Sequence, residues 1–225
     1  MAAVASSQVA MTAIIGNSTA LNAVVTSSVA MAAVASSQVA MTAVAASQVA
    51  MAAIQKSQTA LNAIAASSMA TAKYAAGAAG LNPADYADMA AVASSQVAMT
   101  AVAASQVAMA AVAASNTATK AIAASQTALN AIAGSTTALD ALYAKKSRLT
   151  GASAAKSGKF IILEISANSA FDTSRYGYAT LSDGSKPNWQ DYKSKYAYFK
   201  QFKEIATYIK NDTEGDDWID YFPCG

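Results

Sequence analysis

The sequence predicts a mainly α protein, in which an elongated, coiled-coil-like helical shaft of ten-residue repeats carries a small α+β C-terminal tip. The first observation is the repeat itself, since nearly every decad starts with Met or Leu, with Thr119 the exception, and the regular decads have Val or Ile at place four. The second is a change in composition, because only three cations and two anions precede Asp140, whereas both Trp and all five Phe follow Gly134. A repetitive segment is therefore joined to one of ordinary globular composition.

The decads form two series that differ in register. Seven run over residues 1–70 and five more over residues 89–138, and a degraded decad starts at Leu139. Place seven is nearly always Ser, and places three and ten are Ala throughout the regular decads. These boundaries predict a first repeat arm over 1–76, a break over 77–88, a second arm over 89–148, a linker over 149–158 and a C-terminal tip over 159–225.

The repeat favours a helix over a strand. Places one and four lie on one helical face, Ala, Met, Leu and Gln are good helix formers, and the decads contain no Pro. Ten residues at about 100° each fall about 80° short of three turns, so a continuous helix must be overwound. The alternative is a strand and turn in every decad, which would give a β-solenoid or an intertwined β shaft. Against it, the turns lack the usual Gly, Asn or Asp.

The break between the series has its own start signals for a helix. Asn82 is a good N-cap, Pro83 suits a first helical position, and Asp85 lies where the helix dipole favours an anion. The repeat resumes at Met89, two residues before the register of the first arm would place it. The pattern leaves open whether the second arm continues the first or folds back beside it.

A helix with this apolar face needs partners, since the face offers only Met, Val and Ala. We therefore predict a homotrimer in which copies of the chain pack about one axis. Representative residues of the expected oligomer core are Met1, Ala3, Val4, Ala10, Met31, Val34, Met99 and Val102.

The C-terminal part predicts strands followed by a helix. Residues 159–167 form the strongest strand pattern, and residues 176–185 form a second that ends in the Asp183-Gly184 turn signal. A period of 3.6 in the aromatic and apolar residues then indicates a helix from about Trp189 to Lys210. The core is small for about 70 residues, which also favours an oligomer.

The composition excludes several classes of function. The chain has no His, and no base accompanies its many Ser, so we expect no catalytic residue, no enzyme activity and no cofactor. A net charge of +2 does not indicate nucleic acid as a partner, and the absence of a long apolar run excludes membrane insertion. The first residues lack the charged and apolar regions of a signal peptide.

Two further features have simple interpretations. An acidic group comprises Asp212, Glu214, Asp216, Asp217 and Asp220, but it lacks the spacing of a calcium loop, so a solvated acidic turn is favoured and no metal is expected. The single cysteine, Cys224, excludes an internal disulfide and is expected to be an inert thiol rather than a cross-link.

Aromatic residues near the C-terminus are the candidates for ligand contact, because exposed rings can stack on sugars. The five candidates are Tyr176, Tyr178, Trp189, Trp218 and Tyr221. The alternative is that most of these rings belong to the core.

The decads, of the form M-x-A-V-x-x-S-x-x-A, followed by a compact aromatic domain, resemble bacteriophage tail-fibre and receptor-binding proteins. The resemblance covers the repeats and is one of composition. It implies a virion protein that acts outside the cell as a homotrimer, contacts other tail proteins and binds a bacterial surface glycan or protein through its tip. The chain starts at place one of a decad, so an anchor is expected either to be missing or to be replaced by the N-terminus.

Two other functions stay open beside this one. A self-assembling structural filament or surface protein needs no ligand. An Ala-rich ice-binding protein needs a regular array of Thr, but place nine mixes Val and Thr. A depolymerase tip is disfavoured by the absence of His.

Overall fold

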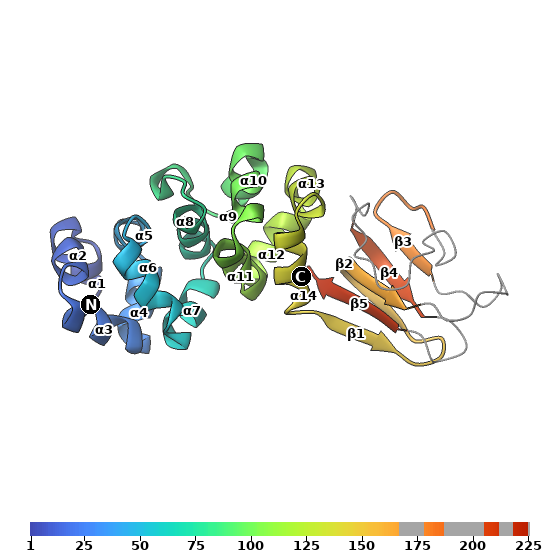
Figure 1. Cartoon of the computed structure of the whole chain (residues 1–225), viewed down its shortest axis with the longest axis horizontal. Coiled ribbons are helices and arrows are strands. Elements are labelled where there is room, and N and C mark those ends of the chain that lie inside the picture. Colours follow the sequence, from blue (N-terminus) through green and yellow to red (C-terminus); the bar gives the residue numbers. More distant parts are fainter. Residues whose placement is uncertain (167–177, 187–204, 212–217, 225) are drawn as a thin grey trace. The chain divides into compact units, whose positions relative to one another are not determined.

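The computed structural model describes residues 1–166, 178–186, 205–211 and 218–224. The chain divides into two compact units, Met1–Ala128 and Leu129–Gly225. The described residues are mainly helical, with a small antiparallel sheet in the second unit (Figure 1). The predicted fold class is confirmed at this level.

In the repeats, each decad forms one short α-helix rather than part of a long one. The helices of the first series are α1 (Ala2–Ala5), α2 (Gln8–Ile15), α3 (Ser18–Thr26), α4 (Ser28–Ala35), α5 (Gln38–Ala45), α6 (Gln48–Gln55), α7 (Gln58–Ala65) and α8 (Ser68–Ala78). Those of the second are α9 (Met89–Ser94), α10 (Gln96–Ala104), α11 (Gln106–Ala114), α12 (Asn116–Ala123), α13 (Gln126–Ala133) and α14 (Thr136–Tyr143).

The serine at place seven separates one helix from the next. Ser37 has an extended backbone (φ −104°, ψ 119°), and its side chain accepts a hydrogen bond from the backbone N–H of Ala40. This is N-capping, which satisfies one of the unpaired N–H groups at a helix start. Because the extended residue recurs in each decad, consecutive helices turn sharply, for example by 98° between α4 and α5.

The expectation of a continuous, coiled-coil-like helix is therefore wrong, and so is the β alternative. The helical interpretation gave this Ser no structural role, and the β alternative placed it in a turn between strands. Ten residues fall about 80° short of three helical turns. Because a cap ends each helix within its decad, this shortfall does not add up along the chain, and the helices need no overwinding. Each decad therefore forms one short helix and one sharp bend in the chain.

The helices stack in a solenoid with three helices in each turn. In the first unit, most helices contact the third one along the chain, as in the series α2, α5, α8 and α11 (Figure 1). The caps also join the turns, because the Ser37 hydroxyl donates a hydrogen bond of 2.6 Å to the carbonyl of Ala5, 32 residues earlier. Ser57 and Ser125 make the same bond to Val25 and Ala93.

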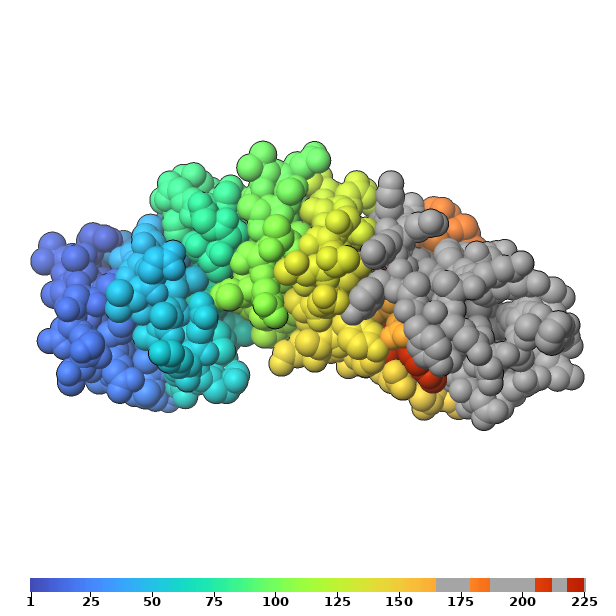
Figure 2. All heavy atoms as spheres, in the orientation of Figure 1, coloured from blue at the N-terminus to red at the C-terminus, as the bar shows by residue number. Residues whose placement is uncertain are grey.

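The core of the first unit lies inside this stack. Places one and four point inward, and Met41 and Val44 are 0% and 3% exposed. Alanine at place ten also has a clear role, since Ala40 and Ala50 are fully buried where the start of one helix approaches its neighbours. On the face shown in Figure 2, the atoms of successive turns are in contact along residues 1–128. One chain thus covers the apolar face that the sequence suggested would need other copies.

The break joins the two series without ending the stack. Gly80 has a positive φ of 75° and ends α8, and η1 (Pro83–Asp85) follows with Asn82 as its N-cap, as predicted. The fully buried Lys73 donates hydrogen bonds to the carbonyl oxygens of Pro83 (2.9 Å) and Tyr86 (3.3 Å). Helix α8 contacts both α5 and α11, so within the first unit the second series continues the first.

The sheet in the second unit has the strand order β1-β5-β2-β4-β3, and all its pairs are antiparallel. The strands are β1 (Ser147–Thr150), β2 (Ala155–Ser166), β3 (Tyr178–Leu181), β4 (Ala206–Lys210) and β5 (Trp218–Pro223). Strands β2 and β3 confirm the two predicted strands. The sheet packs its own apolar cluster, in which the rings of Phe160 and Tyr221 meet edge to face at 5.0 Å.

Two expectations for this unit need correction. The expected linker over 149–158 contains the end of β1 and the start of β2, because Leu149 and Lys156 find partners in β5 and β4. The expected helix over 189–210 is wrong at 206–210, which is strand β4. There, pairing on both sides with β2 and β3 overrides a helical period. Residues 187–204 lie outside the described residues.

Candidate functional site

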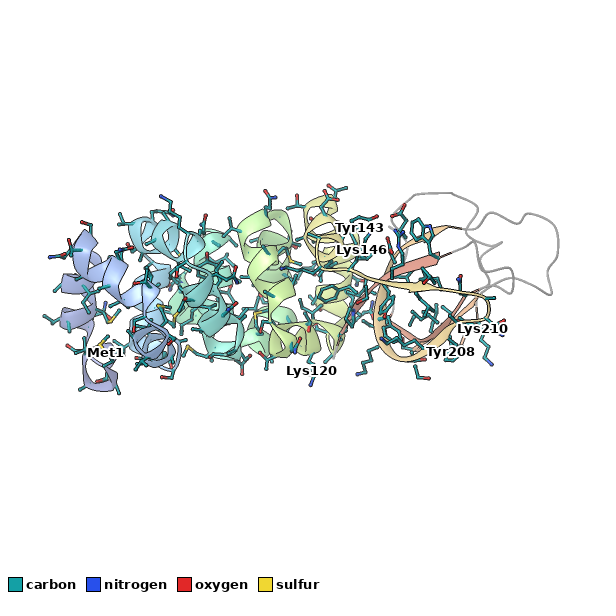
Figure 3. The ribbon with its side chains drawn as sticks, turned by 90° about the horizontal axis from the view of Figure 1, so that it is seen from below. Met1, Lys120, Tyr143, Lys146, Tyr208 and Lys210 are labelled. Atoms are coloured by element: carbon teal, nitrogen blue, oxygen red, sulfur yellow. The ribbon has the colours of Figure 1, made fainter. Side chains whose placement is uncertain are left out.

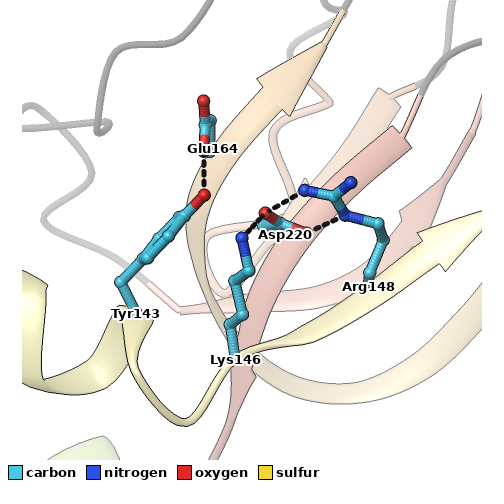
Figure 4. A network of polar contacts seen from close by, with 5 residues as sticks. All are labelled: Tyr143, Lys146, Arg148, Glu164 and Asp220. Atoms are coloured by element: carbon cyan, nitrogen blue, oxygen red, sulfur yellow. Dashed lines mark hydrogen bonds and ion pairs between the residues drawn. The ribbon is translucent and has the colours of Figure 1, made fainter.

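The best-defined group of polar side chains lies where α14 meets the sheet. It comprises Tyr143, Lys146, Arg148, Glu164 and Asp220, and we call it the Asp220 cluster (Figure 4). Tyr143 ends α14, Lys146 follows it, Arg148 is on β1, Glu164 on β2 and Asp220 on β5. Contacts of α14 with β2 and β5 bring these residues together.

Asp220 is the centre of the cluster. Its side chain is 0% exposed, and two cations satisfy its carboxylate. Lys146 Nζ lies 2.5 Å from Oδ2, while Arg148 donates through Nε to Oδ1 (2.6 Å) and through Nη2 to Oδ2 (2.8 Å). Arg148 reaches it because Arg148 and Asp220 are directly paired between β1 and β5.

Aromatic rings complete the cluster. Lys146 Nζ lies 3.6 Å from the centre of the Tyr143 ring, and the guanidinium carbon of Arg148 lies 3.7 Å from that of Trp218. The Tyr143 hydroxyl donates a hydrogen bond of 2.6 Å to Glu164, whose side chain lies at the buried surface of β2. Each charged group of the cluster therefore has a partner of complementary charge or polarity.

The protonation states argue for a structural role of this cluster. Burial alone would raise the pKa of Asp220, but the hydrogen bonds and charges of Arg148 and Lys146 outweigh it and lower that pKa. Burial would lower the pKa of Lys146, yet its bonds to Asp220 and Tyr143 raise it. The bond to Glu164 raises the pKa of Tyr143. At neutral pH none of these three groups is poised to exchange a proton, as a general acid or base must.

The aromatic residues predicted to bind a receptor have different surroundings. Trp218 starts β5 and is half-buried beneath Arg148, so part of it is accessible. Tyr221 is 3% exposed and belongs to the core of the sheet, so its prediction as an exposed ring is wrong. Tyr178 lies in β3, but its side chain, like Tyr176 and Trp189, lies outside the described residues.

The predicted oligomer core lies mostly inside one chain. Met31, Val34, Met99 and Val102 are at most 1% exposed within the solenoid. Their burial is internal to the first unit and so does not require another copy. In the first turn the positions are more open, since Met1 and Ala3 are exposed and Val4 and Ala10 are half-buried.

Metal and thiol chemistry find little support in the described residues. Four of the five acidic residues in the suspected turn lie in 212–217, outside the description, and the fifth, Asp220, is held by two cations. No group of three potential metal ligands occurs among the residues that the structure describes. Cys224 is buried and free, and burial raises the pKa of its thiol to about 12, which supports the prediction of an inert thiol.

The outer surface of the solenoid is nearly free of charge and carries apolar residues at place nine. Val9, Val29 and Val97 are 81%, 74% and 73% exposed. Lys120 is one of the few charged side chains there, and it points away from the helices (Figure 3). Among the described residues no single helix is long and apolar enough to cross a membrane; three pairs of consecutive helices meet that test only when taken together across bends of 98–105°.

No protein-family model matches this chain, and no curated protein is significantly similar to it.

The Asp220 cluster was not predicted from the sequence, because Lys146 and Arg148 lie in a basic stretch next to the expected linker. The available signal was the alternation of Ser147, Arg148, Leu149 and Thr150, which is short for a strand.

Proposed function

We propose that the protein is a structural adhesin of a phage tail fibre, in which the repeats serve as a shaft and the C-terminal domain binds a glycan on the bacterial surface. The observation that carries the proposal is the contrast between the two units. The first is a closed stack of near-identical, almost uncharged helices, which suits a spacer. The second concentrates the charged and aromatic side chains that recognise ligands.

The proposal includes a non-enzymatic role and a virion location. It also includes a homotrimer, although the solenoid already buries its own apolar face, so three copies would meet along outer surfaces or through the tip. Contacts with other tail proteins complete this picture. Support comes from the resemblance of the repeats and from the pKa directions of Asp220, Lys146 and Tyr143, which do not suit proton exchange at neutral pH.

The test is binding of the purified full chain, carrying a fluorescent label, to a panel of bacterial cells. We expect saturable binding to some strains and its loss after periodate oxidation of the surface sugars. If binding survives periodate treatment of the cells but is lost after protease treatment, the receptor is a protein rather than a glycan. Failure to bind any strain in the panel or to compete with phage adsorption would contradict the adhesin role.

Sedimentation velocity tests the oligomer separately. A trimer has three times the monomer mass of 22.7 kDa. A species of monomer mass at all concentrations would remove the trimer from the proposal and leave the binding role intact. Concentration-dependent growth without an endpoint would favour the self-assembling filament that needs no ligand.

A second candidate, an ice-binding protein, is favoured by the exposure of place nine. The outward Val side chains and the exposed Thr19 and Thr117 repeat on a surface with few charges. Inhibition of ice recrystallisation by the wild type, abolished by Val29→Lys with Val97→Lys, would support this candidate. Recrystallisation at the rate seen with an inert protein would exclude it.

A further inference from the structure

Arg148 is the more exposed of the two cations that pair with the buried Asp220. Its side chain is 42% exposed, whereas that of Asp220 is 0% exposed. The salt bridge uses one N–H of Nε and one of Nη2. A guanidinium has five N–H groups, so three are left outside this salt bridge.

The guanidinium is also held in a fixed orientation. Two hydrogen bonds to Asp220 define its plane, and the Trp218 ring lies 3.7 Å from its central carbon. Ordering a free arginine on binding costs conformational entropy. Here folding has already ordered the side chain, so a ligand that pairs with the exposed edge meets a preorganised donor.

The charge distribution selects the kind of ligand. The two carboxylates of the cluster are buried, at 0% exposure for Asp220 and 9% for Glu164, so the charged groups that reach the surface are the cations, Arg148 and, less exposed, Lys146. Residues 144–163 carry five cations and no anion, whereas the four acidic residues of 212–217, before Trp218, lie outside the described residues. A bidentate pair with a carboxylate or phosphate is the strongest interaction open to such an edge.

We propose that Arg148 and Trp218 form a subsite for an anionic group, a carboxylate or phosphate, of an acidic surface glycan. The inference rests on the proposed adhesin function and specifies the chemistry of its ligand. The exposed edge of Arg148 pairs with the anion, and the accessible part of Trp218 contacts the apolar face of the adjoining sugar ring. Asp220 positions Arg148 and does not touch the ligand.

Trp218 provides the reporter for a direct test. The chain has two tryptophans, so Trp189→Phe leaves Trp218 as the single source of tryptophan fluorescence. We would titrate this variant with trigalacturonate as the carboxylate probe, glucose 6-phosphate as the phosphate probe and maltotriose as the neutral control. We expect a saturable change with one or both anionic probes, weaker at high salt, and none with maltotriose.

Two substitutions on this background locate the subsite. Arg148→Lys keeps the charge and a donor for Asp220 but loses the planar fork, and should weaken binding about 10-fold or more. Lys156→Gln removes a charge whose ammonium lies over the Tyr221 ring, on the opposite face of β5 from Asp220, and should leave affinity unchanged. Thermal melting followed by circular dichroism confirms that both variants are folded.

The outcomes separate this inference from the proposed function. If cells bind the protein but neither anionic probe changes Trp218 fluorescence, the subsite is wrong and the adhesin stands. If the probes bind but no cells do, the subsite stands and the adhesin role fails. Equal losses in Arg148→Lys and Lys156→Gln would indicate a diffuse charge effect and would overturn the assignment to Arg148.

Discussion

The two units are stabilised by opposite means. The solenoid of Met1–Ala128 distributes its stability over many similar contacts, in which most decads contribute a serine cap, a buried Met or Leu and a close-packed Ala. In the described part of the sheet unit, the buried carboxylate of Asp220 connects β5 to Arg148 on β1 and to Lys146, which follows α14. In a repeat fold, a substitution in one decad removes only one of many similar contacts. In the polar network of the second unit, the loss of Asp220 removes both ion pairs at once.

The comparison can be tested by following both units in one experiment. Far-ultraviolet circular dichroism reports mainly on the helices, and tryptophan fluorescence reports on the second unit, because both tryptophans follow Leu129. Denaturant unfolding of each variant then gives separate free energies of unfolding for the two units.

The largest expected effect is that of Gly77→Ala, at the closest approach of α8 to α5. A Cβ at this position would lie 2.2 Å from the carbonyl oxygen of Ala45, which is backbone and cannot move aside freely. We expect a loss of about 3 kcal/mol in the circular dichroism transition. Gly16→Ala is the matched control, since its Cβ would meet its nearest atom at 3.4 Å and should change stability by less than about 0.5 kcal/mol. Equal effects would refute the close approach.

Asp220→Ala should come next, and it should act on fluorescence rather than on the helical transition. It leaves Lys146 and Arg148 without their shared anion, but both retain contact with water, so we expect a loss of about 2–3 kcal/mol. Asp183→Ala, which removes an exposed carboxylate in the turn after β3, should have a much smaller effect. A matching loss in both variants would mean that the cluster is not the centre of the unit.

The same carboxylate predicts a dependence on pH. The folded state lowers the pKa of Asp220 below its unfolded value, so the unfolded state binds more protons between the two values. The stabilisation is fully present above the ordinary pKa of Asp, about 4, and is lost as the pH falls through the lower folded value. The acid-induced fluorescence transition should therefore become shallower in Asp220→Ala.

A smaller effect distinguishes two kinds of serine in the solenoid. Ser37 caps α5 and also bonds to Ala5 in the preceding turn, whereas Ser47, in the next decad, only caps α6. Ser37→Ala should therefore cost about 2 kcal/mol and Ser47→Ala about 1 kcal/mol. Equal costs would show that the bonds between turns add nothing to the caps.

The smallest effect concerns the buried ammonium in the break. Burial lowers the pKa of Lys73, although Asp85 opposes the shift. Between the lowered pKa and the ordinary value of 10.5 the unfolded state binds more protons, so the helical unit should gain stability as the pH rises through this window. Lys73→Met should abolish that gain, while Lys56→Met, at an exposed lysine, should preserve it. If the stability of the helical unit still rises with pH in Lys73→Met, the rise does not come from Lys73 and the prediction is wrong.

The sequence predicts helices, the core positions and the break, because these depend on local propensity and periodicity. Met41 and Val44 are buried as their places suggest, and Asn82 caps η1. What the pattern concealed was the end of each helix. Ser37 carried that signal as a preferred N-cap, but a helical period continued across it and suggested one long helix.

The candidate site was less predictable, for a physical reason. The two ion pairs of Asp220 join residues that are 72 and 74 positions apart along the chain, so no local pattern connects them. The pairing of β1 with β5 brings Arg148 next to Asp220. Strand pairing also explains why residues 206–210 form β4 and not the expected helix. Trp218 was identified by its residue type, but its arginine partner was not.

The central claim is that each turn of three decads returns the chain to the same side of a stack. Spin labels at Val9→Cys and Met69→Cys test it, since they lie on α2 and α8, two turns apart in the series α2, α5 and α8. The buried Cys224 should not react with the label. Samples diluted with unlabelled protein exclude distances between chains.

Pulsed electron paramagnetic resonance then measures the separation of the two labels. Helices pack about 8–10 Å apart, so the solenoid predicts about 16–20 Å between the labelled helices, plus the length of the labels. A continuous helix would place the same residues about 90 Å apart. A short, narrow distance distribution is the result that the solenoid predicts, and a distance near the longer value would contradict it.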